Sequence, residues 1–279
     1  MTGASAAPLP DLGLGVLSWR GYASLDAMLD ALNRHGLPTL AGERLVFLPE
    51  EEEQGHRIAA RHGFASRGHA ENLGIHGGFR ALAGVLEARY VLLLENDLHA
   101  TEPLAEAGRQ LAHGLRLLRE GRAHVVQFRD LDRPGQAFQG IPKYRAYHPA
   151  PDAPWPARAT AALRRTVRPA KAERMIGNAP FAEAAPERRF PQAVTRDAEG
   201  FFLMSSRHRV WSNQSILVER RFFLDHLLEY VERAPTTRRV NGFKNIEIEL
   251  NGAWWREQDL QVAVAPGFLT HERIGDRGY

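Results

Sequence analysis

The chain has 279 residues, 44% of them hydrophobic and 25% charged, which suits one large globular core and excludes a wholly disordered chain. It has no cysteine, so disulfide bonds and thiolate metal sites are excluded. The formal net charge of +3 favours phosphate-bearing partners in general, and we expect no nucleic-acid partner. Residues 1–10 lack a signal-peptide pattern, and no apolar run approaches the ~20 residues that span a bilayer. We therefore expect a cytoplasmic protein, either soluble or peripheral at the inner face of the membrane.

The first half of the chain alternates apolar strands with amphipathic helices. The expected helices are 24–35, 54–62, 72–88 and 103–120, and the expected strands are 14–18, 44–48, 90–94 and 123–128. Ser24 is expected to cap the first helix, and Gly36 to end it. This alternation predicts an α/β fold whose mostly parallel central sheet carries helices on both faces.

The middle of the chain is rich in proline, alanine and arginine. Four closely spaced prolines predict an absence of regular structure around them: Pro149, Pro151, Pro154 and Pro156. The basic stretch 158–174 is expected to be either a short helix or a solvated loop. An alternative hypothesis is that this stretch forms a surface that contacts anionic lipid, which would make the protein peripheral to a membrane.

The last third of the chain returns to regular patterns. It predicts a strand at 201–210, helices at 219–233 and 244–257, a strand at 261–264, and a tail from 266. We divide the expected single domain into a nucleotide-sugar half at 1–133, an insertion at 134–200, and an acceptor-side and catalytic half at 201–279.

The most distinctive local feature is the acidic end of the apolar strand 90–94, where Glu95, Asn96 and Asp97 follow directly. Ligands of open α/β sheets gather beyond the carboxyl ends of the strands, and carboxylate oxygens there suit a hard divalent cation. Asp and Asn are also common in ordinary turns, so this motif alone does not decide between a site and a loop.

The motifs around this strand end resemble those of family 2 glycosyltransferases with the GT-A fold, of the bacterial surface-polysaccharide type. Ser18 ends the first strand as that family's small polar residue beside the nucleotide does, and Glu50 follows the second strand as its acidic contact to the base does. Asn72 opens an Asn-x-Gly helix start, and Glu95-Asn96-Asp97 takes the place of the family's Asp-x-Asp motif. The resemblance implies that Asp97 binds metal, with Glu95 as the least certain ligand, and that Asn96 contacts the donor.

Later segments resemble the acceptor and catalytic parts of the same family. Trp211 and Asn213 stand in the stretch that resembles the acceptor segment. The run 245–250 resembles the acidic catalytic segment, with Glu247 at the position of the base and Glu249 as the other candidate. Residues two apart on a helix point to different sides, so only one of the two glutamates should face the site.

The C-terminal segment 268–273 resembles the strand and loop that return a histidine to the metal in this family, which implies that His271 is a ligand. Arg273 and Arg277 are then expected to neutralise the diphosphate of the donor. The implied cofactor is a divalent metal, Mn²⁺ or Mg²⁺, and the implied donor is a nucleoside-diphosphate sugar, with UDP favoured.

The resemblance implies transfer of the sugar to a hydroxyl of a glycan or small-molecule acceptor, with inversion of the anomeric centre. Two other hypotheses stay open on sequence alone. One is a non-catalytic protein on this scaffold that binds carbohydrate or an anionic surface, and the other is a sugar-phosphate nucleotidyltransferase, for which the loop after the first strand is a poor match. A P-loop enzyme is excluded because the chain has no Gly-Lys-Ser/Thr motif.

Overall fold

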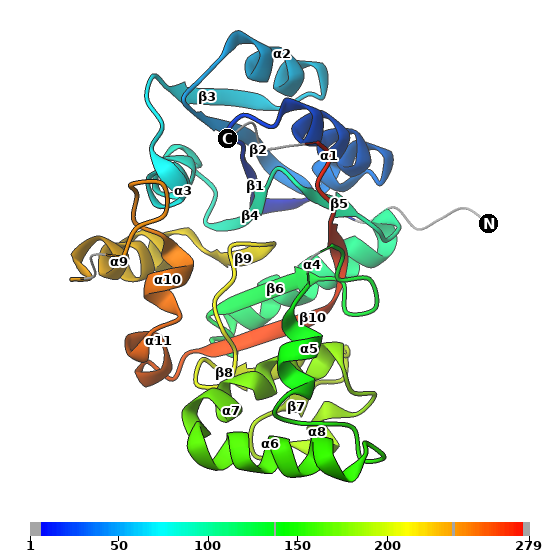
Figure 1. Ribbon diagram of the computed structural model, residues 1–279. Coiled ribbons are helices and arrows are strands. Elements are labelled where there is room, and N and C mark those ends of the chain that lie inside the picture. Colours follow the sequence, from blue (N-terminus) through cyan, green and yellow to red (C-terminus); the bar gives the residue numbers. More distant parts are fainter. Residues whose placement is uncertain (1–6, 137, 236–237, 276–279) are drawn as a thin grey trace.

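The computed structural model describes residues 7–136, 138–235 and 238–275. Arg277 lies outside these residues, so its expected role at the diphosphate stays a prediction. A single sheet runs through the described chain, with helices packed on both of its faces (Figure 1). The expected α/β architecture is confirmed. No helix in the described ranges is long and apolar enough to cross a membrane.

The sheet contains ten strands in the described residues. In chain order they are β1 (Leu9–Leu17), β2 (Ala41–Pro49), β3 (Ala65–His69), β4 (Tyr90–Glu95), β5 (Leu98–Ala100), β6 (Val125–Arg129), β7 (Thr195–Arg196), β8 (Phe202–Ser205), β9 (Ile216–Glu219) and β10 (Gln261–His271).

The helices of the first half are α1 (Tyr22–Arg34), η1 (Leu37–Leu40), α2 (Glu53–Arg61), α3 (Gly74–Val85) and α4 (Leu104–Arg119). Those of the middle are α5 (Gly140–Arg145), α6 (Trp155–Val167), α7 (Pro169–Met175), η2 (Ile176–Phe181) and α8 (Pro186–Arg189). Those of the last third are the π-helix η3 (Phe222–Leu228), α9 (Glu229–Arg233), α10 (Ile246–Leu250) and α11 (Ala253–Glu257).

The strand order is β3-β2-β1-β4-β9-β6-β10-β8-β7, and β5 pairs with the far end of β10. Neighbours β3, β2, β1 and β4 are parallel. Strand β9 runs antiparallel to both β4 and β6, and β10 is parallel to β6. Strands β3, β2, β1, β4, β6 and β10 therefore share one direction, and their carboxyl ends lie along one edge.

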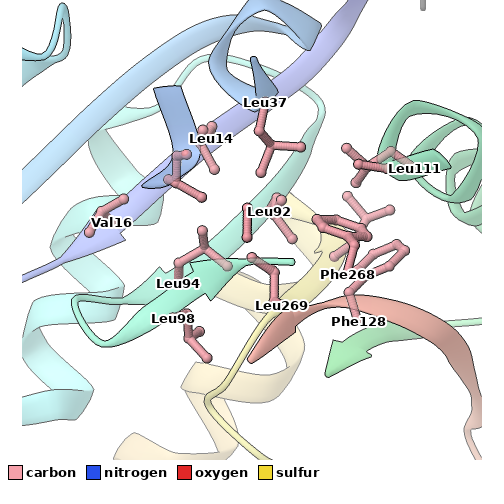
Figure 2. Packing of buried hydrophobic residues seen from close by; sticks show 14 of the residues in the cluster. Leu14, Val16, Leu37, Leu92, Leu94, Leu98, Leu111, Phe128, Phe268 and Leu269 are labelled. Atoms are coloured by element: carbon pink, nitrogen blue, oxygen red, sulfur yellow. The ribbon is translucent and has the colours of Figure 1, made fainter. Parts of the chain in front are cut away.

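Two apolar cores cover the two faces of the sheet, because side chains on a strand alternate between faces. On β4, Leu92 and Leu94 enter the core under α1 and α4, whereas Val91 and Leu93 enter the core under α3 and η3. Figure 2 shows the first core, where Leu92 and Leu94 pack with residues of β1 and β10. A strand buried on both faces reads as one continuous apolar run, which is why β4 is so clear in the sequence.

Four strands escape the sequence prediction: β3, β5, β7 and β9. Strand β7 is only two residues long. Strand β3 lies at the edge of the sheet and has only exposed or half-exposed residues, so it lacks an apolar signal. Strand β5 is only three residues long, and β9 follows directly on the loop 211–215. The sequence predicts no strand between the expected strand 201–210 and the expected helix 219–233, where β9 lies. Strand β9 separates β4 from β6 with the opposite direction.

The expectation for the prolines around residue 155 is wrong. Helix α6 begins at Trp155, with Pro154 at the N-cap and Pro156 in the first turn. Proline is tolerated there because the first turn has no intrahelical acceptor for its missing N–H. The insertion is an ordered helical lobe, and the basic stretch within it forms two helices, α6 and α7.

Two expectations for the end of the chain are also wrong. The segment from residue 266 is part of β10, which continues to His271 past an irregularity between Val264 and Leu269. The single helix expected over 244–257 is split into α10 and α11, because the side chain of Asn251 bonds to the backbone of Trp211 in both directions. Local sequence patterns predict neither of these two features, because both depend on contacts between distant parts of the chain.

Candidate active site

The ends of β1, β2 and β4 meet at one edge of the sheet. Leu17 pairs with Phe47 on one side and with Glu95 on the other. The residues that follow each strand are therefore neighbours in space, although up to 79 positions separate Ser18 from Asp97 in the sequence. This registration brings the predicted polar residues of the first half together.

Asn96 ties the end of β4 to the turn after β1. Its Nδ2 donates to Ser18 Oγ at 3.0 Å and to the carbonyl of Arg20 at 3.3 Å. Arg20 and Gly21 both have a positive φ, so this turn is tight and left-handed. Asn96 lines the pocket described below, and Ser18 is buried behind it.

Glu50 is bonded through both carboxylate oxygens. The indole N–H of Trp19 donates to Oε2 at 2.7 Å, and Arg20 donates to Oε1 at 3.1 Å. These contacts, the indole bond first, hold the pKa of Glu50 below its usual range. Trp19, which the sequence argument did not assign, lines the pocket itself, and the neighbour of Glu50 in the pocket wall is Pro49.

Asn72 shapes the start of α3. Its Oδ1 accepts the backbone N–H of Gly74 at 2.8 Å, an Asx turn that sets the direction of the helix. Gly74 has a φ of +63° and lies against Phe243, where a Cβ would approach the phenyl carbons to 2.5 Å. Only glycine fits this close approach between the two walls of the pocket.

Asp97 is almost completely buried and connects the loop after β4 to the C-terminal segment. Its Oδ2 accepts from His271 Nε2 and from Arg273 Nη2, each at 3.0 Å. Burial by itself raises the pKa of Asp97, but the bonds and charges of His271 and Arg273 outweigh it, so the pKa lies below its usual value. Asp97 therefore stays ionised. The structure brings together three residues that the sequence assigned to one site.

A second contact fastens the C-terminal segment over the pocket. Ser24 Oγ donates to the carbonyl of Ile274 at 2.8 Å and accepts the Ile274 N–H at 3.1 Å. The backbone N–H of Glu272 also donates to the carbonyl of Asp97 at 2.8 Å. The expectation that Ser24 caps α1 is wrong, since the helix begins earlier, at Tyr22, and the hydroxyl serves the C-terminal segment instead.

These segments enclose an open pocket at the edge of the sheet, with an empty volume of about 980 Å³ including its mouth. One wall comes from the ends of β1, β2 and β4 and the start of α3. The other wall comes from residues 240–245 and 273–275. The position of the pocket beyond parallel strand ends is where ligands bind in open α/β sheets.

The residues around Asp97 offer a partial set of metal ligands. Asp97 Oδ1 is buried without a hydrogen-bond partner, and His271 Nδ1 lies 3.3 Å from the carbonyl of Gln136. The imidazole tautomer that donates from Nδ1 to this carbonyl would present its Nε2 lone pair to a metal, and the hydrogen bond from Nε2 to Asp97 would then be given up. Glu95 also lines the pocket. Within the described ranges no group of three His, Asp or Glu side chains is arranged to hold a metal, so further ligands would have to come from a substrate or water.

The two candidate glutamates of α10 have different surroundings, as expected for residues two apart on a helix. Glu247 is half-buried, its Oε1 accepts the backbone N–H of Asn213 at 3.1 Å, and its charge acts on Arg129 together with that of Asp97. Glu249 is buried, and its Oε1 has no partner. Burial raises the pKa of Glu249, with Lys244 and Arg239 opposing the shift.

The expectation that Trp211 contacts an acceptor is wrong for this structure. Its side chain is only 1% exposed and stacks on Phe223, with its edge against Trp255. The indole N–H donates to Asn213 Oδ1 at 2.9 Å. Trp211 thus fixes Asn213, whose backbone in turn holds Glu247. Asn213 is also buried and keeps its acceptor-side assignment only as a prediction.

Arg129, at the end of β6, is a residue of this edge that the sequence argument missed. It donates to the carbonyl of Pro134 at 2.6 Å and to Gln214, and its guanidinium lies 4.5 Å from the ring centre of Phe138. Among the described residues it has no ion pair, and burial lowers its pKa to about 10. An arginine directly after an apolar strand was the available signal, because its strand ends at the same edge as β4.

No protein-family model and no curated protein matches the sequence. Among solved structures, S. aureus TarS (residues 1–349) in complex with UDP-GlcNAc superposes with a TM-score of 0.50 at 12% identity, over 95% of this chain and 60% of that chain. The fold is that of GT-A glycosyltransferases.

Another similar structure is glucosyl-3-phosphoglycerate synthase from Mycobacterium tuberculosis in complex with Mn²⁺, UDP-glucose and phosphoglyceric acid. Its TM-score is 0.49 at 12% identity, over 95% of this chain and 72% of that chain. This chain spans less than two thirds of the TarS fragment. The candidate site lies beyond the carboxyl ends of β1, β2 and β4.

Proposed function

We propose that this protein is a glycosyltransferase that moves a sugar from a nucleoside-diphosphate sugar to an acceptor hydroxyl. The observation that carries the proposal is Asp97, a buried, ionised carboxylate at the carboxyl edge of the sheet with one unpartnered oxygen facing no protein donor. It lines the pocket at this edge and is flanked by His271, Arg273 and the turn after β1. UDP is the favoured nucleotide, because the TarS structure with the same fold holds UDP-GlcNAc.

The donor would occupy the pocket between the two walls. Asn96 and the backbone around Ser18 offer polar contacts beside Trp19, whose ring supplies an apolar surface for a base. Asn72 lines the same pocket from the start of α3. Arg273, held by Asp97 at the pocket wall, is placed to counter the charge of a diphosphate.

Asp97 and His271 would hold a divalent metal, Mn²⁺ or Mg²⁺, through Oδ1 and Nε2, because oxygen and imidazole donors suit both ions. When bound, such an ion stabilises the charge that develops on a diphosphate leaving group. Glu95 lines the pocket as a further candidate ligand. Arg273 already contacts Asp97, so its guanidinium can stay next to the diphosphate with or without the ion.

Glu247 is the proposed base. Its Oε1 is held by the backbone N–H of Asn213, which leaves Oε2 to accept the proton of an acceptor hydroxyl. The charges of Asp97 and Glu247 both act on Arg129, which supports a role for the two carboxylates in one site. A single base opposite the leaving group favours inversion of the anomeric centre.

The decisive experiment has two readouts. A thermal-shift screen of UDP, GDP, ADP and CDP with Mn²⁺ should identify one nucleotide that stabilises the native protein. The matching nucleotide sugars should then be consumed by the wild type, and EDTA should stop the reaction. The proposal is wrong if no nucleoside diphosphate stabilises the protein and no donor is consumed faster than by Asp97→Ala, a result that would favour a non-catalytic binding protein.

A further inference from the structure

Helix α6 turns its apolar side chains away from the protein. Trp155, Leu163 and Val167 are 73%, 64% and 66% exposed, the highest values among the large hydrophobic residues of the described chain. The other side of the helix is its attachment to the lobe, where Ala161 is only 1% exposed. A surface helix normally shows the opposite pattern, with its apolar stripe facing the core.

The three exposed residues form one continuous stripe. They lie on the ridge 155, 159, 163 and 167, with a spacing of four residues, and Ala159 completes it. At ~100° per residue, Trp155, Leu163 and Val167 lie roughly 120–160° around the helix axis from Ala161. The stripe therefore faces outward along the whole helix, and Figure 1 shows α6 on the outer rim of the lobe, with α7 between it and the sheet.

Basic residues flank this stripe. The segment 153–172 contains Arg158, Arg164, Arg165, Arg168 and Lys171 and no acidic residue. The acidic residues nearest in the sequence are Asp152 and Glu173, and Glu173 faces Arg207 at 3.8 Å. The helix that carries the stripe and the start of α7 thus carry five basic residues and no negative charge.

Polar contacts hold the helix in this orientation. Arg165 donates to the carbonyl of Tyr147 at 2.6 Å, and Arg164 donates to the carbonyl of Ala146 at 3.2 Å. The two arginines fasten α6 to the turn after α5, whereas the stripe takes no part in the attachment. Rotation of the helix to bury the stripe would break both bonds, so the exposed apolar face is built into the lobe.

We propose that α6 docks this protein onto the surface of an anionic phospholipid bilayer. The stripe would enter the boundary between headgroups and acyl chains, with Trp155 at the interface that this residue type prefers. Arg158, Arg168 and Lys171 would contact the anionic headgroups. A soluble polyanion explains the charges but leaves the apolar stripe in water, which is why the lipid surface is the better partner.

The test is co-sedimentation of the full chain with two kinds of vesicle, phosphatidylcholine alone and phosphatidylcholine mixed with phosphatidylglycerol. The wild type should bind the mixed vesicles and remain in solution with phosphatidylcholine alone. The tryptophan emission should shift to shorter wavelength on binding, and Trp155→Phe should remove this shift. Absence of binding to the mixed vesicles overturns the proposal.

Paired variants separate the apolar from the charged contribution. Leu163→Ser with Val167→Ser keeps the charge and should weaken vesicle binding at least about tenfold. Arg158→Gln with Arg168→Gln keeps the stripe and should weaken binding about 25-fold, about fivefold for each charge. The matched control, Val85→Ser with Arg233→Gln, makes the same kinds of change at exposed sites on α3 and α9 and should bind like the wild type.

A soluble polyanion as the partner of α6 would give a different result. If heparin displaces the protein completely and the Leu163→Ser, Val167→Ser pair still binds the mixed vesicles like the wild type, α6 is a site for polyanions and the membrane proposal is wrong. Circular dichroism of each variant checks that the lobe is folded. Nucleotide stabilisation should be unchanged in all of these variants, so the outcome is independent of the proposed transferase activity.

Discussion

The two sides of the pocket are built in different ways. One side consists of the residues that directly follow the apolar strands β1, β2 and β4. They meet because these strands are parallel neighbours in the sheet. The other side consists of residues 240–245 and 273–275, which reach the pocket only through the path of the C-terminal third. The first side depends on local pattern and sheet register, and the second depends on a few individual tertiary contacts.

Asp97 and His271 show where the two sides meet. Asp97 follows β4 directly, so its place is set by the sheet. His271 reaches it because β10 continues past Pro266 and Gly267 and pairs with β5, which places His271 opposite Leu98. We therefore expect changes at the proposed reacting groups, Asp97 and Glu247, to act on the transfer rate. Changes at the contacts that position the C-terminal segment should act on stability and on ligand binding.

The largest effect is expected for Asp97→Asn. The amide keeps the volume but removes the charge that His271 and Arg273 share, and it cannot replace an ionised metal ligand. Transfer from the stabilising nucleotide sugar should fall about 1,000-fold. Initial rates with Mn²⁺ measure this, and Asp225→Asn, an exposed aspartate on η3, is the control and should retain full activity. A variant as active as the wild type would remove Asp97 from the site.

Glu247→Gln tests the proposed base on α10. Its transfer rate should fall about 100-fold, while the thermal shift with UDP and Mn²⁺ stays as in the wild type. Glu249→Gln is the matched control two residues away, and its transfer should be nearly unchanged because Glu249 is buried. If the two variants exchange these results, Glu249 is the base and Glu247 is not.

Gly267→Ala tests how the course of β10 positions His271 beside Asp97. Gly267 has a φ of +91°, and a Cβ there would lie 2.3 Å from the carbonyl oxygen of Arg129. Denaturant unfolding should show a loss of about 3 kcal/mol or more. Gly200→Ala has a φ of +86° but meets no atom closer than 3.7 Å, so it should lose only about 1 kcal/mol. Equal losses in the two variants would mean that the close contact at β10 is relieved cheaply.

Ser24→Ala tests the fastening of the C-terminal segment. It leaves the N–H and the carbonyl of Ile274 without their partner, which should lower stability by about 1 kcal/mol and weaken nucleotide binding several-fold. Titration of UDP with Mn²⁺ by calorimetry measures the affinity. Thr39→Ala removes a surface hydroxyl that bonds outside the pocket and should leave the affinity unchanged. Unchanged affinity in Ser24→Ala would show that Ile274 does not shape the donor site.

The smallest effect is a pH dependence at Glu249. Its folded-state pKa is raised by burial, so the folded protein binds this proton more tightly than the unfolded chain does. Its contribution to stability is present below the ordinary pKa of glutamate and is lost as the pH rises through the raised value. Glu249→Gln should therefore gain melting temperature relative to the wild type as the pH rises above about 4.3. A constant difference between pH 4 and 8 contradicts this.

The sequence by itself predicted the parts of the fold that carry strong local patterns. The run Tyr90–Glu95 is buried on both faces, so it reads as an uninterrupted apolar strand, and the acidic residues after it mark the edge of the sheet. The prolines of the insertion predict an absence of regular structure, which is wrong for Pro154 and Pro156. They stand at the start of α6, where proline destabilises a helix little. Edge strand β3 and the short β5 left no apolar signal to find.

What the sequence determined about this protein is the course of the central strands and the polar residues that follow them, since both depend on neighbouring residues and a fixed period. Only the tertiary structure decided that Trp211 supports the site from within the core, that Glu247 and Glu249 have different surroundings, and that Ser24 fastens Ile274. These outcomes depend on contacts between residues far apart in the chain, whose geometry no local pattern specifies.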